Sequence, residues 1–321
     1  MSELLIWIAA FIASIVILIK SSDYFTDSAE KIGISLKLPA FIIGVTIVSI
    51  GTSLPELVSS IFAILRGSSE IVIGNVIGSN IANIFLVLGV AAIVAKKTIK
   101  IDFELLHVDL PLLVGSAFLL TLTIWDGIFT LPEAILCILG IIIYLLYTLS
   151  SERKHKDTEI EKEMESELKN KKGLSWKTIA VLILSAVFIY LGAKYTIESV
   201  IQLSSILNIG KEVIAVTAVA LGTSLPELFV TITAARKGKS EMAVGNILGS
   251  NIFNSFAVMG VPAFFGTLII PQNILLFSLP VMIIATLLFF FMTQEKQISK
   301  WEGYLLLLFY IFFVGKLFSL F

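Results

Sequence analysis

The sequence predicts an all-α polytopic membrane protein with ten transmembrane helices, arranged as two inverted five-helix repeats. Three observations lead to this prediction: the composition, the spacing of the apolar runs and a long internal duplication. Of the 321 residues, 57% are hydrophobic and only 15% are charged, and the mean hydropathy is +0.98. Soluble domains carry about 25% charged residues. A water-soluble globular fold is therefore excluded, because it would have nowhere to place this much apolar surface.

The apolar runs give the helix count. A helix that spans a bilayer needs about 20 mostly apolar residues. Ten stretches are candidates: 4–19, 38–65, 71–95, 105–124, 128–149, 174–193, 211–235, 241–266, 273–292 and 301–320. No basic segment precedes the first run and no small-residue cleavage motif follows it, so we expect it to be a retained helix rather than a signal peptide.

The basic residues orient these helices, because cytoplasmic loops are enriched in Lys and Arg. With the N-terminus outside, 19 of the 23 basic residues fall inside. The four that fall outside are Arg66, Lys194, Lys211 and Lys316. The prediction is therefore a multi-pass protein of the cell (plasma) membrane with both termini outside.

One long polar segment, 151–175, interleaves Glu and Lys, which is typical of a solvated linker. The orientation places this segment in the cytoplasm. It divides the chain into a first five-helix repeat, 1–150, and a second repeat, 176–321.

The two halves are copies of each other. A shift of 171 aligns 45–83 with 216–254 without a gap, and 22 of the 39 aligned positions are identical. GTSLPEL (51–57) matches GTSLPEL (222–228), and GNVIGSNIAN (74–83) matches GNILGSNIFN (245–254). Five helices per half is an odd number, so the second copy enters the membrane from the opposite side. This inverted repeat is the architecture that lets one site face either side of a membrane.

Each copy places one carboxylate, Glu56 or Glu227, inside an apolar helix. A charge near the bilayer centre costs at least ~2.5 kcal/mol, and neither motif contains Lys or Arg to neutralise it. A bound cation would supply the missing positive charge. Further candidate ligands are side chains with oxygen atoms on the same two motifs: Thr52, Ser53, Ser79, Asn83, Thr223, Ser224, Ser250 and Asn254. Oxygen ligands without His or Cys favour hard cations such as Ca2+ and Na+.

Spacing brings these donors together. Thr52 and Glu56 are four residues apart and share a helix face, and Ser79 and Asn83 repeat this relation. Pro55 and Pro226 are predicted to break or kink their helices and to free the backbone carbonyls just upstream. Free carbonyls at membrane depth are tolerated where they line a cavity or meet an ion.

The paired G-T-S-L-P-E and G-S-N-I-x-N motifs closely resemble the two alpha repeats of the sodium/calcium exchanger family, specifically its compact prokaryotic members. The resemblance covers nearly the whole chain. It implies a Ca2+ site made by Glu56 and Glu227 with the backbone carbonyls of Thr52 and Thr223. It also implies that helices 1 and 6 slide past a fixed core. The implied flanking Na+ sites use both glutamates with Ser53, Ser79, Ser224, Ser250 and the carbonyls of Ser49 and Ala220.

The chain departs from some relatives at one position. Those relatives carry Asp where this chain has Asn254, and that Asp accompanies K+ dependence in one branch. The resemblance therefore implies a site with two carboxylates and no K+ requirement.

The sequence-based hypothesis is an antiporter that exchanges Na+ for Ca2+, with these ions as its substrates in a lipid bilayer. We expect no cofactor, no nucleic acid and no protein partner. An H+-coupled Ca2+/cation antiporter is the alternative, although the Thr-Ser-x-Pro-Glu run favours Na+. A Ca2+-permeable channel would pass Ca2+ without a Na+ countergradient. An intramembrane enzyme is disfavoured, because no HExxH or Ser–Lys arrangement lies in the helices and Cys137 is isolated.

Overall fold

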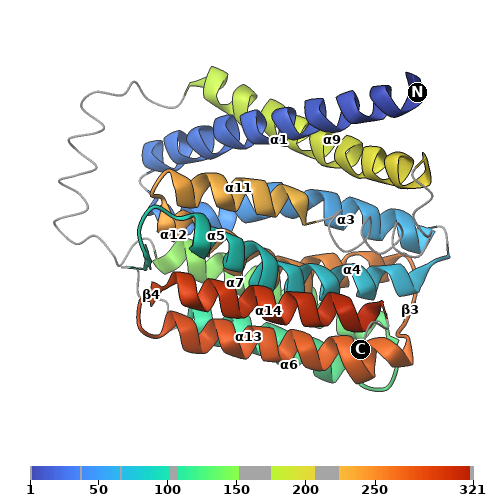
Figure 1. Ribbon diagram of the computed structural model, residues 1–321. Helices are drawn as coiled ribbons and strands as arrows, with labels where there is room; N and C mark the ends of the chain where they lie inside the picture. The colour runs from blue at the N-terminus through green and yellow to red at the C-terminus, as the bar shows by residue number, and fades with distance from the viewer. Residues whose placement is uncertain are drawn as a thin grey trace.

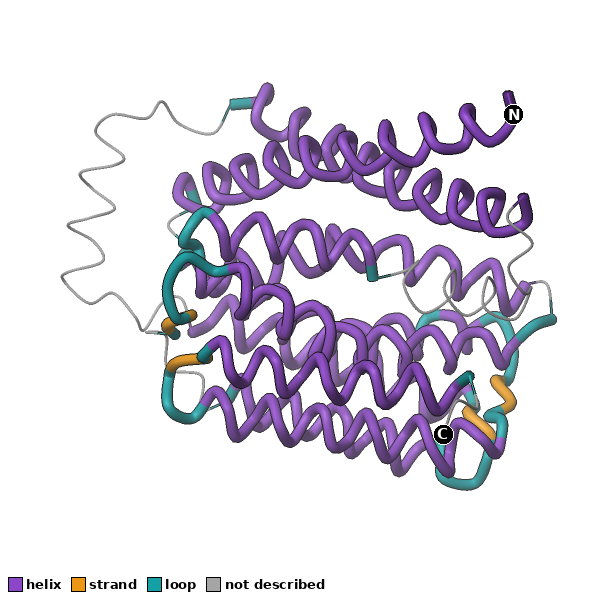
Figure 2. Tube along the Cα trace, in the orientation of Figure 1, coloured by secondary structure: helices purple, strands orange, loops and turns teal. Residues whose placement is uncertain are grey.

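The computed structural model describes residues 2–36, 38–65, 67–101, 108–151, 175–206 and 224–318. Nearly all of them lie in helices that run roughly along one common axis (Figure 2). Seven helices are long and apolar enough to cross a membrane: Glu3–Ser35, Ala40–Leu65, Ser69–Val94, Leu131–Thr148, Trp176–Leu203, Ser240–Phe264 and Ile274–Thr293. A shorter apolar helix covers Asp109–Thr123. These helices confirm a mostly helical polytopic fold, whereas the count of ten spans stays a prediction.

Apart from the first helix, the helices of the first half follow the predicted runs closely. They are α1 (Ser2–Ser35), α2 (Ala40–Ile43), the π-helical turn η1 (Gly44–Val48), α3 (Ser49–Leu65), α4 (Ser69–Ala82), the π-helical turn η2 (Asn83–Leu88), α5 (Gly89–Val94), α6 (Asp109–Thr123) and α7 (Leu131–Ser151).

The second half repeats this order. It comprises α9 (Trp176–Ile206), α11 (Leu225–Arg236), α12 (Ser240–Phe253), the π-helical turn η3 (Asn254–Val258), the short 3-10 turn η4 (Pro262–Phe264), the π-helical turn η5 (Ile274–Ser278), α13 (Leu279–Thr293) and α14 (Lys300–Leu317). Most of the predicted 151–175 linker lies outside the described residues, as does 207–223.

The predicted ends of the first and sixth helices are wrong. The runs 4–19 and 174–193 stop where the apolar residues stop, but α1 continues to Ser35 and α9 to Ile206. A helix does not end merely because its residues become polar, and α1 meets no proline until Pro39. With about 1.5 Å of rise per residue, α1 is ~51 Å long, which exceeds the ~30 Å hydrocarbon core.

Two short antiparallel ladders join the two halves. β1 (Ile99–Lys100) pairs with β4 (Gln297–Ile298), and β2 (Ile128–Phe129) pairs with β3 (Leu268–Ile269). β4 and β3 lie at opposite ends of the molecule (Figure 1). Each ladder therefore connects a segment of the first half to one of the second, one ladder at each end.

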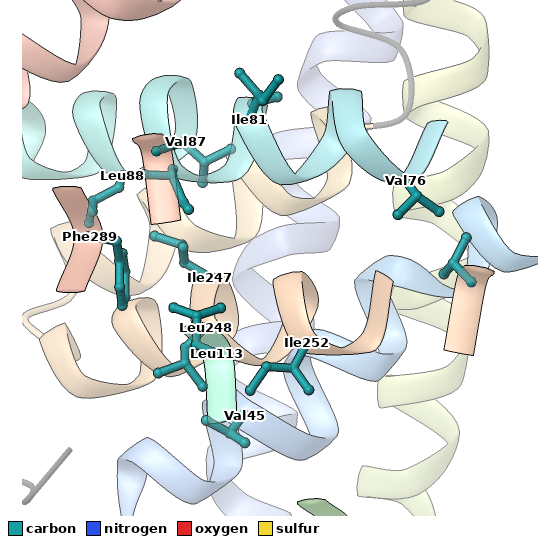
Figure 3. Close-up of a cluster of buried hydrophobic side chains, with 14 of the residues drawn as sticks. Val45, Val76, Ile81, Val87, Leu88, Leu113, Ile247, Leu248, Ile252 and Phe289 are labelled. Atoms are coloured by element: carbon teal, nitrogen blue, oxygen red, sulfur yellow. The ribbon is translucent and has the colours of Figure 1, made fainter. Parts of the chain in front are cut away.

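The helices form layers. α1 and α9 cross each other as an outer pair, and α1 also contacts α11 (Figure 1). α12 contacts η1, α2 and α3 and is buried along nearly its whole length, whereas α1 and α9 are mostly exposed on their outer sides. On the far side from α1, α13 packs on α6 and α14 packs on α5. Figure 3 shows the apolar contacts around α12, where Ile247, Leu248 and Ile252 lie among side chains from other helices.

Glycines allow α12 to approach the first half closely. A Cβ atom on Gly249 would lie 2.5 Å from the Val45 carbonyl oxygen and 2.6 Å from Ser49 Oγ. A Cβ atom on Gly245 would lie 2.5 Å from the Phe41 carbonyl oxygen. These two glycines are spaced Gly-x-x-x-Gly, the pattern that permits close helix packing in membranes. As a result, α12 lies directly against the helix that leads into α3.

Candidate functional site

α3 carries four of the predicted site residues on consecutive turns. Ser49, Thr52, Ser53 and Glu56 are all buried, and none is more than 2% exposed. Thr52 Oγ1 lies 3.3 Å from the Ser49 carbonyl oxygen, to which it donates. The Ser49 hydroxyl donates to the Val45 carbonyl. The hydroxyls near the start of α3 therefore bond partly to their own helix, which leaves the Glu56 carboxylate without such a local donor.

Pro55 lies inside α3, so of the two predicted effects, a break or a kink, the break is wrong. A proline removes one amide donor, which here would have bonded the Gly51 carbonyl, and the helix continues on both sides. The irregular turn lies upstream instead, at η1, where the coil widens into a π-helical turn. π-helical turns inside α-helices are frequent at functional sites.

In the second half, α11 begins at Leu225 and places Pro226 in its first turn, where a missing amide costs little. Glu227 follows in the same turn and is 2% exposed. Ser224, directly before the helix, is also buried. The other two predicted ligands of this half, Ala220 and Thr223, lie outside the described residues.

The two glutamates come together across the two halves. Ser53 Oγ on α3 donates to Glu227 Oε1 on α11 at 3.0 Å. Glu56 is three residues after Ser53, so the two side chains project from the same side of α3, where Ser53 contacts Glu227. Neither side chain faces the outside of the molecule, since Glu56 is 1% exposed. The structure therefore places two acidic groups side by side in a buried position.

α4 and α12 supply matching polar residues. Ser79 and Asn83 on the first half and Ser250 and Asn254 on the second are all buried. Asn83 begins η2 and Asn254 begins η3, so each half widens into a π-helical turn at the same motif position. The duplication therefore extends from the sequence to this local backbone irregularity.

Many polar atoms of these residues have no hydrogen-bond partner among the residues that the structure describes. They are both carboxylate oxygens of Glu56, Glu227 Oε2, the side-chain oxygen and nitrogen of Asn83, Ser224 Oγ, Ser250 Oγ and Asn254 Oδ1. Buried polar groups are nearly always paired in folded proteins, so each exception needs an explanation. Here the exceptions are mostly oxygen acceptors and belong to the predicted site. Unpaired acceptors around two carboxylates are what a bound cation would satisfy.

The donor set limits which cation could bind. In the part of the chain that the structure describes, no three His, Cys, Asp or Glu side chains gather into a metal-binding group. A cation between Glu56 and Glu227 would therefore be held by two carboxylates and by neutral hydroxyl, amide and carbonyl oxygens. Such an all-oxygen set fits Ca2+ or Na+ and not a soft metal ion.

Asn80 connects the two halves beside the site. Its amide nitrogen donates to Ser255 Oγ at 2.9 Å, and its Oδ1 accepts from Asn254 Nδ2 at 3.2 Å. These bonds link α4 of the first half to η3 of the second half. Asn251, the equivalent residue of the second half, instead donates through Nδ2 to the Ile247 carbonyl of its own helix at 2.7 Å.

Two asparagines near the site were missed by reasoning from the sequence. Asn75 donates to Ser60 Oγ at 3.0 Å, and Asn246 donates to Thr231 Oγ1 at 2.8 Å. The sequence contained a signal for this pair. The shift of 171 that aligns the motifs relates Asn75 to Asn246, and it also relates their hydroxyl partners, Ser60 and Thr231.

Comparisons with known proteins agree with this geometry. The family profile described as "Sodium/calcium exchanger protein" matches residues 6–151 and 177–318. The sodium/calcium exchanger MaX1 of Methanosarcina acetivorans is 36% identical over 95% of this chain and 96% of its own length. The inner membrane protein YrbG of Escherichia coli is 34% identical over 79% of this chain and 78% of its own length.

Solved structures of the sodium-calcium exchanger NCX_Mj have the same fold. The crystal soaked with 2.5 mM Na+ and 10 mM Sr2+ superposes with a TM-score of 0.82 at 29% sequence identity, covering 97% of this chain and 99% of that one. The crystal soaked with 2.5 mM Na+ and 0.1 mM Ca2+ gives a TM-score of 0.81, also at 29% identity, over 97% of this chain and 98% of that one.

Proposed function

Because this chain belongs to the sodium/calcium exchanger family, we propose that it exchanges Na+ for Ca2+ across the membrane by alternating access. The family consists of multi-pass membrane antiporters and not of enzymes. The observation that carries the proposal is the buried pair of Glu56 and Glu227, in which three of the four carboxylate oxygens accept no hydrogen bond from any described residue. The transported cations would be coordinated by these oxygens.

The ligand assignments follow the motifs. Ca2+ lies between Glu56 and Glu227 with the backbone carbonyls of Thr52 and Thr223. The flanking Na+ ions use the same glutamates with Ser53, Ser79, Ser224, Ser250 and the carbonyls of Ser49 and Ala220. Asn83 and Asn254 line the site. Support comes from the unpaired oxygens of Ser224, Ser250 and Glu56 and from the burial of every member that the structure describes.

Shared ligands couple the two fluxes. Two carboxylates neutralise one Ca2+, so the loaded site carries no net charge in a low-dielectric interior, where residual charge is costly. Na+ ions compete for the same oxygens and exclude Ca2+. The empty site keeps its negative charges, and the protein in this state does not switch its access from one side of the membrane to the other. If more than two Na+ bind, each cycle moves net charge and responds to membrane potential.

The architecture we propose is ten spans in two inverted repeats. The described chain starts and ends at the same end of the molecule, whereas α7 ends and α9 begins at the other end (Figure 1). The paired ladders at opposite ends support the same symmetry. The outer pair α1 and α9 would slide past the core to expose the site alternately, with both termini outside the plasma membrane and the 151–175 linker in the cytoplasm.

Reconstituted transport tests the proposal. The purified protein is placed in Na+-loaded proteoliposomes, and uptake of radioactive Ca2+ is followed under Na+, K+ or H+ gradients. We expect the Na+ gradient alone to drive uptake. Glu56→Gln or Glu227→Gln should lower uptake by about a hundredfold, because each removes a charged ligand. Glu70→Gln is the matched control, since Glu70 is exposed in the first turn of α4 and should have no effect.

Other outcomes identify the alternatives. Uptake driven by an H+ gradient and indifferent to Na+ would indicate H+ coupling. Uptake that needs no countergradient would indicate a channel. Normal uptake by either glutamine variant would remove the proposed ligands and refute the site.

A further inference from the structure

Asn246 on α12 connects the two helices that carry the glutamates. Its Nδ2 donates to Thr231 Oγ1 on α11 at 2.8 Å. Its Oδ1 lies 3.4 Å from Thr52 Oγ1 on α3, whose single hydroxyl hydrogen is shared between this oxygen and the Ser49 carbonyl. Thr231 is one turn after Glu227, and Thr52 is one turn before Glu56. A single side chain, 1% exposed, therefore bonds next to both carboxylate-bearing turns.

Asn75 occupies the equivalent position on α4. Its Nδ2 lies 3.0 Å from Ser60 Oγ, 3.2 Å from the Glu56 carbonyl oxygen and 3.3 Å from Ser59 Oγ. Ser60 is one turn after Glu56, as Thr231 is one turn after Glu227. Both halves thus use an asparagine amide to hold the turn that follows the glutamate.

An amide is suited to this bridging role. It offers two donors and an acceptor on one short side chain, whereas a carboxylate only accepts and a hydroxyl reaches fewer partners. The spans that contain α4 and α12 are the most buried of the seven apolar spans found in the described residues. Bonds from these helices therefore fix α3 and α11 to the most enclosed part of the fold.

We propose that Asn75 and Asn246 are positioning residues that set the spacing of Glu56 and Glu227, and thereby the preference for Ca2+ over larger divalent cations. This inference rests on the proposed function. Selectivity among hard cations depends on cavity size, ligand number and rigidity. When hydrogen bonds fix the spacing of the two carboxylates, the site favours cations of one ionic radius. When the spacing can vary, the site accepts cations of several radii.

The test removes the hydroxyl partners and leaves the ion ligands untouched. Na+-driven uptake of Ca2+ and of Sr2+ is measured over a concentration range for Thr231→Val and Ser60→Ala. We expect the half-saturating Ca2+ concentration to rise about three- to tenfold, as loss of one buried hydrogen bond would give. The Sr2+ value should change less, so the preference for Ca2+ falls, and the maximal rate should change less than the half-saturating concentration.

Two further variants separate positioning from general packing. Thr231→Ser restores the hydroxyl and should restore the ratio of the two half-saturating concentrations. Thr286→Val is the matched control on α13, because the Thr286 hydroxyl is equally buried but bonds only the Met282 carbonyl of its own helix. This variant should leave the ratio at the wild-type value.

The proposal is overturned if Thr231→Val and Ser60→Ala keep the wild-type ratio, or if both ions lose maximal rate equally. Thermal stabilisation of detergent-purified protein by Ca2+ and by Sr2+ gives a second readout, independent of coupling to Na+. If the wild-type chain fails to use Na+, the proposed function fails, yet the stabilisation by each ion still reports whether Thr231 and Ser60 tune cation preference.

Discussion

At the scale of single residues, the contact between Ser53 and Glu227 is the direct link between the two halves of the site. Ser53 is fully buried and donates at 3.0 Å to Glu227 Oε1, the one oxygen of the two glutamates with a hydrogen-bond partner among the described residues. Its hydroxyl oxygen keeps lone pairs for a cation while its hydrogen orients the carboxylate. Hydrogen bonds to charged groups contribute more than bonds between neutral groups.

Ser53→Ala removes this donor and one oxygen ligand. We expect the half-saturating Na+ concentration for driving Ca2+ uptake to rise by about tenfold or more, the effect of losing a bond to a charged group. Ser116→Ala on α6 is the control, because Ser116 is equally buried but bonds the Leu113 carbonyl of its own helix. An unchanged Na+ dependence in Ser53→Ala would refute a role for this hydroxyl in ion binding.

Asn254 is an uncharged residue of the proposed site, and this leads to a prediction about K+. Its amide nitrogen bonds Asn80, and it adds no charge to the pair of glutamates. A site with two carboxylates is already neutral with one Ca2+, and no negative charge remains to hold a further monovalent cation. Na+-driven Ca2+ uptake should therefore be the same with K+ or with choline in the medium. Marked stimulation by K+ would contradict this prediction.

At the scale of elements, the packing of α12 against η1 and α3 depends on glycine. A methyl group on Gly249 would meet the Val45 carbonyl and the Ser49 side chain, and neither can move away without shifting backbone. Overpacking of this kind costs about 1–3 kcal/mol. The contact lies directly beside Ser49, one of the residues assigned to Na+.

Gly249→Ala should therefore lower the stability of the protein by about 2 kcal/mol and weaken Na+ binding. Thermal unfolding in detergent measures the first effect, and Na+-driven uptake the second. Gly115→Ala on α6 is the matched substitution, because no described heavy atom lies within 4 Å of the added methyl group. Equal melting temperatures for the two variants would contradict the proposed close approach.

The elements also indicate what the sequence could predict. Glu56 and Glu227 were identified because a buried carboxylate in an apolar helix is costly and needs a reason. The helix ends at 19 and 193 were wrong because hydropathy marks the membrane and not the helix. The ladders between β1 and β4 and between β2 and β3 went unpredicted, since two-residue strands carry no periodic pattern and their partners are distant in the chain.

Partners distant in the chain also explain what was missed in the site. Asn246 is separated by 194 residues from Thr52, to which it bonds. No spacing rule within a helix relates these positions. The break predicted at Pro55 was wrong for a different reason: the loss of a single amide bond left α3 continuous.

At the scale of the whole molecule, α1 and α9 are held to each other and to the core by different contacts. Ser14 on α1 and Thr196 on α9 bond through their hydroxyls at 2.9 Å within the pair. α1 is also tied to the turn after α11, where Lys237 and Lys239 both pair with Asp27 at 2.9 and 3.0 Å.

The ion pairs at this turn are stable near neutral pH. Burial lowers the pKa of Lys237, but its hydrogen bonds to Asp27 and Asp23 outweigh burial and raise the pKa above 10.5. The contribution of this lysine is therefore complete below pH 10.5 and is lost only as the pH rises through the elevated pKa. Salt weakens such partly exposed pairs. A link of this kind can form and break during a transport cycle.

Two cross-links distinguish movement within the outer pair from movement of the pair against the core. Both cross-links are made in a Cys137→Ala background. Ser14→Cys with Thr196→Cys joins α1 to α9, and Asp27→Cys with Lys237→Cys joins α1 to the turn after α11. The cysteines are linked by a short bismaleimide whose spacer contains a reducible disulfide. If α1 and α9 slide together, the first cross-link should leave Na+-driven Ca2+ uptake intact. The second should stop uptake until the linker is reduced, because it fixes the pair to the core. Uptake blocked by the first cross-link, or unaffected by the second, would show that α1 and α9 do not move as one unit past the site.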